Sequence, residues 1–214
     1  MQITIPCETF VRHAGLITPA DDWNGVVRYE NGKLISIMNQ HVGDRWTWPM
    51  IVAEKIGGPD GVIHIIITKE LLTLCQEGAA QGHELMIDVD HTSQWATAML
   101  SDGNFVADNV GRWDAEGDNK YDRWRKPFRA MEHGIHPSQY GVYLLASVLA
   151  ALAKAAPGGE LVTESWVGYP GRPMLWRDET TEDWCAVVSP WKEKVHVRAA
   201  IRPPWVTLDD NPQT

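Results

Sequence analysis

The sequence predicts an α+β fold built from repeated units, in each of which a helix packs on a short antiparallel meander, and the units form two domains. The first observation is the order of patterns late in the chain. A helical pattern over residues 138–156 precedes three strand-like segments at 160–167, 173–177 and 184–188. The second observation is a partial repeat, because residues 79–85 and 155–161 share five of seven amino acids where a helix gives way to a strand. Internal duplication predicts such a match.

The helix expected over residues 138–156 has one apolar face and one face of small and polar residues. The apolar residues recur at i, i+3, i+4 and i+7, so we expect one buried face made of Leu145, Val148, Leu149 and Leu152. The face expected to look outward carries Ser147, Ala150, Ala151 and Lys154. The helix should end at residues 157–159, Pro-Gly-Gly, because proline cannot continue it and glycine favours the turn that follows.

The first unit is expected to open with a strand at residues 2–5 and a helix begun by Pro6, since proline suits the start of a helix. Apolar residues follow at helical spacing, namely Phe10, Ala14 and Ile17. Alternating patterns predict strands at 25–29, 33–39 and 46–54. Asn31 and Gly32 separate the first two of these strands and predict a type I′ hairpin turn, because both residues tolerate positive φ angles.

The second unit repeats this order. A strand is expected at residues 62–67, and Thr68 is a candidate cap for the helix after it. One face of that helix carries Leu71, Leu74, Cys75 and Gly78. Strands are then expected at 84–90, 94–100 and 104–109, with a turn at 101–103. These two units predict a first domain at 1–113, followed by a linker at 114–129 and a second, shorter domain at 130–214 that ends with a strand at 195–201.

Composition narrows the class of protein. A chain of 214 residues with 44% apolar and 22% charged residues is long enough to bury a core. Its formal net charge of -9 does not attract nucleic acid by itself, so any DNA binding needs a local basic surface. The three cysteines are widely spaced in apolar surroundings, which predicts buried reduced thiols and a cytoplasmic protein. No apolar run predicts a membrane span, and the first residues do not resemble a signal peptide.

The order of motifs resembles the closing part of bacterial DNA polymerase sliding clamps. A helix is followed by Gly-Gly-Glu-Leu-Val at 158–162, two strands, and then Cys-Ala-Val-Val-Ser-Pro-Trp-Lys at 185–192. Clamp chains commonly end on Val-Val-Met-Pro-Met-Arg, and here Ser189 and Trp191 replace the two methionines. Residues 121–128 are similar to the Phe-Pro-Asp-Trp-Arg-Arg run that links clamp domains, with an extra arginine and without the proline. Residues 1–6 are similar to the first strand of a clamp.

The resemblance implies a processivity factor that encircles or contacts duplex DNA without sequence specificity, has no catalytic residues, metal or cofactor, and tethers a polymerase. A phage-type or accessory clamp fits this description. The helices of clamps face DNA, which makes the candidate DNA-binding residues Arg12, His13, Lys69 and Lys154. The candidate pocket for a polymerase or another clamp-binding peptide consists of Val187, Ser189, Pro190 and Trp191. Clamps are rings, so a homo-oligomer is expected; four units would close a trimer, and three units a tetramer or no ring.

Two alternatives remain open. A clamp-fold binding module that forms no ring has the same sequence patterns. A metal-dependent hydrolase could use a site made from two loops, with Asp88, Asp90 and His91 in one and His133 and His136 in the other. In addition, the basic and aromatic residues at 123–129 could contact single-stranded nucleic acid, although a linker packed on its neighbouring domain has the same composition. The eleven tryptophans are spread along the chain and indicate core and interface packing.

Overall fold

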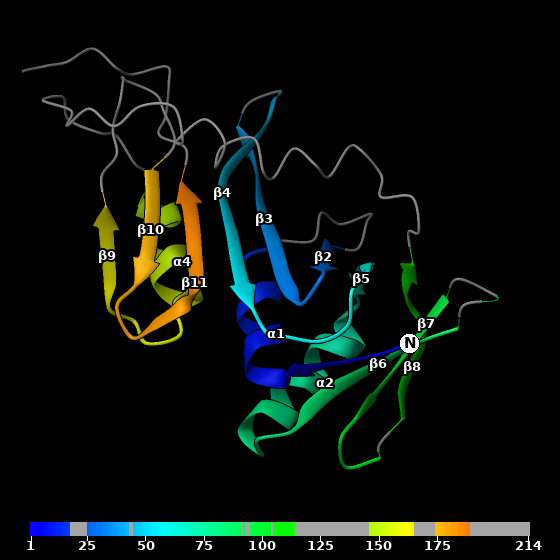
Figure 1. Cartoon of the computed structure of the whole chain (residues 1–214). Helices are drawn as coiled ribbons and strands as arrows, with labels where there is room; N and C mark the ends of the chain where they lie inside the picture. The colour runs from blue at the N-terminus through cyan, green and yellow to red at the C-terminus, as the bar shows by residue number, and fades with distance from the viewer. Residues whose placement is uncertain are drawn as a thin grey trace, which may run out of the picture.

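The computed structural model describes residues 1–17, 25–42, 45–90, 92, 95–103, 105–113, 146–164 and 174–188. Its strands form one 11-stranded sheet in the order β1-β6-β7-β8-β5-β2-β3-β4-β11-β10-β9 (Figure 1). The strands are β1 (Gln2–Pro6), β2 (Gly25–Glu30), β3 (Lys33–Val42), β4 (Arg45–Lys55), β5 (Val62–Ile67), β6 (Glu84–Val89), β7 (Trp95–Leu100), β8 (Phe105–Trp113), β9 (Leu161–Glu164), β10 (Met174–Asp178) and β11 (Thr181–Val188). The helices are α1 (Cys7–Ala14), α2 (Lys69–Ala80) and α4 (Ala146–Ala155).

The first part of the chain contains the order strand, helix, three strands twice, and the two sets are interlocked. The strand β1 leaves its own set to pair with β6, while β5 pairs with β2. β8 and β5 pair only where residues 111–113 meet residues 63–65. Because each set contributes a strand to the other, neither set has a complete sheet by itself.

The helices α1 and α2 lie side by side against one face of this sheet (Figure 1). Alternate residues of the strands point toward them, as in β5, where Ile63, Ile65 and Ile67 are buried. These residues and the inward faces of the helices form one hydrophobic core that also includes Val148 and Leu152 of α4. The opposite face of the sheet carries a second, small cluster on β3 and β4, consisting of Ile35, Ile51 and Ala53.

Local signals in the first part of the chain are confirmed. Asn31 and Gly32 have φ angles of 47° and 76°, as the predicted type I′ turn requires. The side chain of Thr68 caps α2 by accepting a hydrogen bond from the Leu71 amide at 3.1 Å. Pro6 is the last residue of β1 and precedes α1, so the helix begins one residue later than predicted. The predicted strand at 62–67 is β5 without change.

The last part of the chain joins the rest through an edge-to-edge strand pair. β9, β10 and β11 form an antiparallel meander, and β11 pairs with β4 through residues 184–188 and 50–54. α4 confirms the helix predicted at 138–156 over residues 146–155, and residues 138–145 lie outside the described residues. One residue of its expected buried face is wrong, because Leu149 is 41% exposed. The buried stripe instead runs through Val148, Leu152 and Ala155. The linker at 114–129, residue Leu145 and the strand at 195–201 lie outside the described residues, so the domain boundaries stay predictions.

Candidate nucleic-acid and partner interfaces

The exposed charges of the three helices are mostly acidic. Among the described side chains of α1, α2 and α4, the exposed acidic residues are Glu8, Glu70 and Glu77, and the exposed basic residues are Lys69 and Lys154. Two of the four candidate DNA-binding residues therefore lie on the outer surface of the helix layer. Phosphate binding requires a surplus of positive charge, and the described part of this surface has none.

The expected outward orientation of Arg12 and His13 is wrong. Both side chains turn inward from α1 toward the sheet, where His13 is 1% exposed and Arg12 is 14% exposed. The reason is the carboxylate of Glu54 on β4, which attracts both side chains. Arg12 Nη2 donates to Glu54 Oε1 at 2.8 Å and to Oε2 at 3.0 Å. These charge-assisted hydrogen bonds take the place of the water that surrounds a surface arginine.

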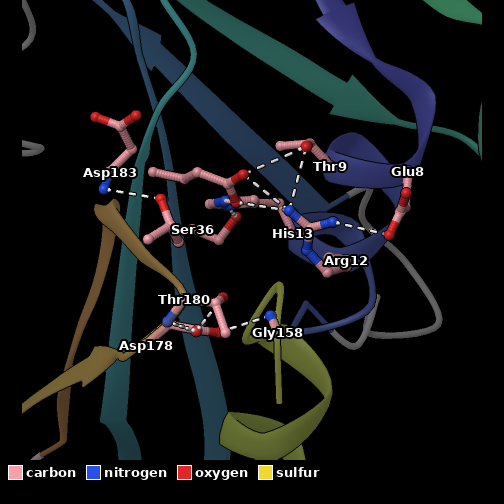
Figure 2. A network of polar contacts seen from close by, with 11 residues as sticks. Glu8, Thr9, Arg12, His13, Ser36, Gly158, Asp178, Thr180 and Asp183 are labelled. Atoms are coloured by element: carbon pink, nitrogen blue, oxygen red, sulfur yellow. Dashed lines mark hydrogen bonds and ion pairs between the residues drawn. The ribbon is translucent and has the colours of Figure 1, made fainter. Parts of the chain in front are cut away.

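A polar network therefore connects α1 with β3 and β4 inside the protein (Figure 2). His13 Nδ1 lies 2.9 Å from Ser36 Oγ, and His13 Nε2 lies 3.3 Å from Glu54 Oε2. Thr9 Oγ1 donates to Glu54 Oε1 at 3.3 Å. A neutral imidazole that carries its hydrogen on Nε2 satisfies both contacts of His13, with the Ser36 hydroxyl donating to Nδ1.

The pKa values of this network agree with a neutral histidine beside an ionised glutamate. Burial lowers the pKa of His13 below its ordinary value, and this effect exceeds the opposite one of the hydrogen bond to Glu54. For Glu54, burial by itself raises the pKa, but the hydrogen bond from His13 and the charge of Arg12 outweigh it, so the pKa is lowered. The net charge inside the network is then close to zero.

The same three residue types, Ser36, His13 and Glu54, occur in the triads of acyl-transfer enzymes. Here the serine is 0% exposed and the histidine 1% exposed, so a substrate has no access to the hydroxyl. The network is therefore a structural connection between helix and sheet. Sequence reasoning missed it, although the alternation along β4 contains the signal: Glu54 follows Met50 and Val52 at a spacing of two, on the face that points to the core.

The candidate partner pocket is described only at Val187. This residue lies opposite Ile51 on the outer face of the sheet, beside the small apolar cluster. Its side chain is 1% exposed, so Val187 does not itself line an open groove. Ser189, Pro190 and Trp191 lie outside the described residues, and the pocket as a whole stays a prediction.

The residues of the alternative metal site are only partly described. Asp88 and Asp90 are exposed, and Asp90 Oδ1 accepts a hydrogen bond from the Thr92 amide at 2.8 Å. Within the described ranges, no three histidine, cysteine or acidic side chains come together as metal ligands. His91, His133 and His136 lie outside these ranges. In the same part of the chain, no helix is long and apolar enough to cross a membrane.

Comparisons with known proteins point to the fold of a clamp. No family model and no curated protein matches the sequence. Among solved structures, a DNA polymerase sliding clamp from Pseudomonas aeruginosa, crystallised with a ligand, matches with a TM-score of 0.51 and 12% identity. The match covers 89% of this chain but 66% of the clamp chain, so this chain spans just under two thirds of that length. At this identity the likeness shows a clamp-like α+β fold and nothing of the clamp's partners.

Proposed function

We propose that the chain is a sliding-clamp-like DNA polymerase processivity factor, which encircles or contacts duplex DNA without sequence specificity and tethers a polymerase at its surface. The observation that carries this proposal is the likeness of nearly the whole fold to a sliding clamp. The clamp role is topological, so it is compatible with a chain whose described polar network is structural and closed to substrates.

The pairing of β4 with β11 supports assembly into an oligomer. It joins two helix-backed parts of one chain edge to edge into a continuous sheet. Another edge is available for the same contact between chains: in the described part of β8, only residues 111–113 pair with β5. A second copy that pairs there would extend the sheet from chain to chain, and the assembly is a ring if the rotation between successive copies closes.

Sedimentation of the purified full-length chain tests this assembly. We expect a closed homo-oligomer of one defined size, whose mass is independent of concentration over the measured range. A monomer at every concentration would contradict the ring and leave the clamp-fold binding module, the alternative that the acidic helix surface favours.

Binding to duplex DNA tests the role of the helices. We expect weak, salt-sensitive binding by the oligomer. The double variant Lys69→Glu/Lys154→Glu should reduce the slope of log K against log salt by about 1 for each phosphate that it no longer neutralises. Arg12 is unsuitable for this test, because its charge is paired inside the protein. The matched control is Lys33→Glu/Lys55→Glu, which makes the same charge change at exposed positions of the sheet. Equal reductions in the two double variants would remove the helices as the DNA surface.

Titration of a clamp-binding peptide against the Trp191→Ala variant tests the partner site. A buried aromatic anchor contributes about 2 kcal/mol or more to binding, which predicts at least about a tenfold loss of affinity in calorimetry. The replacement of methionine by Ser189 also predicts poor binding of peptides that suit the usual pocket. Unchanged affinity in a folded Trp191→Ala variant would place the partner site elsewhere.

A further inference from the structure

Two cysteines that are far apart in sequence meet between α1 and α2. Cys7 is the first residue of α1, and its amide donates to the His83 carbonyl at 3.1 Å, which fixes this end of α1 beside the end of α2. Cys7 Sγ packs on α2 at Gly78, where an added β carbon would lie 3.1 Å from the sulfur. Cys75 lies three residues before Gly78 on the same buried face of α2.

The two thiols lie close together between the helices. Each of them shifts the pKa of the other, downward for Cys7 and upward for Cys75, and both side chains are 0% exposed. Both cysteines are reduced in this structure. The contact of Cys7 Sγ with Gly78 places this sulfur within one helical turn of Cys75 on the buried face of α2, a separation that side-chain rotation can close to a disulfide.

We propose that Cys7 and Cys75 are a redox-sensitive pair, which a peroxide converts into an intramolecular disulfide that connects α1 to α2. One thiol attacks the peroxide, its S–H and the O–O bond break, and a sulfenic acid and one water form. The second thiol attacks that sulfur, the S–S bond forms, the S–O bond breaks, and a second water leaves. One peroxide is reduced to two waters as the two thiols are oxidised to one disulfide.

The geometry assigns different roles to the two sulfurs. Cys7 lies at the N-terminus of α1, where the helix dipole favours a thiolate. Burial raises the pKa of Cys7, with the charges of Glu84 and Asp102 adding to this effect and the neighbouring thiol of Cys75 opposing it. Burial also raises the pKa of Cys75. Cys7 is therefore the attacking sulfur and Cys75 the resolving one.

Burial of the two thiols also limits the rate of their oxidation. Because both thiols are inaccessible and protonated, the reaction waits for the first turn of α1 to open. We expect slow oxidation in buffer and much faster oxidation in mild denaturant, where such local openings are more frequent. The disulfide should therefore form during sustained exposure to peroxide and not during a brief exposure.

Treatment of the full chain with hydrogen peroxide, followed by mass spectrometry of its proteolytic peptides without reduction, tests the proposal. We expect one linked peptide pair, Cys7 with Cys75, and an intact mass lower by two hydrogen atoms. The disulfide closes a long loop, so the melting temperature should rise by about 5 to 10 °C and return after reduction. Cys185→Ser is the matched control, because it removes a thiol that is remote from this pair and should change none of these results.

Two variants and a refolding experiment test whether the disulfide joins these two cysteines. Cys7→Ser and Cys75→Ser should each abolish the linked pair and the rise in melting temperature. Refolding in a mixture of reduced and oxidised glutathione removes the barrier of burial, so the pair should form there even if peroxide acts slowly. Free Cys7 and Cys75 after such refolding, or a disulfide through Cys185 in their place, would overturn the proposal.

Discussion

The turn from α2 to β6 and the turn from α4 to β9 begin with similar sequences but are held in different ways. After α2, the amides of Gln81 and His83 both donate to the Gly78 carbonyl, at 3.1 and 2.8 Å, so the helix end satisfies its own turn. After α4, Pro157 stands where Gln81 stands in the motif, and proline has no amide hydrogen to donate. The amide of Gly158 instead donates to Asp178 Oδ2 at 2.7 Å (Figure 2).

The strand after each turn shows the consequence. Leu85 of β6 pairs with Leu100, and the matching Leu161 of β9 pairs with Asp178. Both partners are buried, Leu100 at 4% and Asp178 at 3% exposure. Leu100 needs no hydrogen-bonding role, because the amides of the turn after α2 already bind the Gly78 carbonyl. In the turn after α4, the carboxylate of Asp178 supplies the acceptor for the Gly158 amide.

The largest effect is expected from Leu100→Asp. This change removes a buried leucine and places a carboxylate where the turn offers no free donors, so the free energy of unfolding should fall by about 4 kcal/mol or more. Denaturant unfolding at neutral pH measures it. A loss below about 1 kcal/mol would mean that the turn after α2 has donors for a carboxylate and that the two turns are equivalent.

Asp178→Ala should cost about 3 kcal/mol of unfolding free energy. It leaves the amide of Gly158, and the amide and hydroxyl of Thr180, without their acceptor. Asp178→Asn keeps one acceptor oxygen and should recover part of the loss. Equal losses in the alanine and asparagine variants would show that packing, and not hydrogen bonding, explains the burial of Asp178.

Gly158→Ala should cost about 2 kcal/mol, because the added β carbon would overlap the side chain of Thr180, which is itself bonded to Asp178. Gly82→Ala is the matched change in the other turn. There the space is open, and only the φ angle of 73° opposes alanine, at about 1 kcal/mol. Thermal unfolding of both variants compares them, and a larger loss at Gly82 would reverse the contrast between the turns.

The smallest effect is expected from pH. Burial by itself raises the pKa of Asp178, but hydrogen bonds from Thr180, Gly158 and Gly159 outweigh it and lower the pKa. A carboxyl group with a lowered pKa stabilises the fold above its unfolded pKa of about 3.9 and loses this contribution as the pH falls through the folded value. The difference in stability between wild type and Asp178→Asn should therefore narrow below about pH 4. A constant difference down to about pH 2 would mean that the carboxylate is not the bonding form.

Much of the secondary structure followed from local patterns. Asn31 with Gly32, Thr68 before α2 and the alternation along β5 each depend on residues close in sequence, and each predicted its element correctly. Leu149 shows the limit of such patterns. Three of the four predicted apolar positions lie on α4, namely Val148, Leu149 and Leu152, and only packing against α1 and β4 selected which of them are buried.

The sequence by itself determined the order of helices and strands, the turns between them and the alternation of the strands, because these depend on backbone sterics and side-chain spacing over a few residues. Only the tertiary structure decided what Arg12 and His13 do. Their partner Glu54 lies 42 and 41 residues away, and burial beside that carboxylate turned two expected surface cations into parts of the interior. The meeting of Cys7 with Cys75 has the same origin, since a polar or reactive group takes its role from neighbours that only the packed fold supplies.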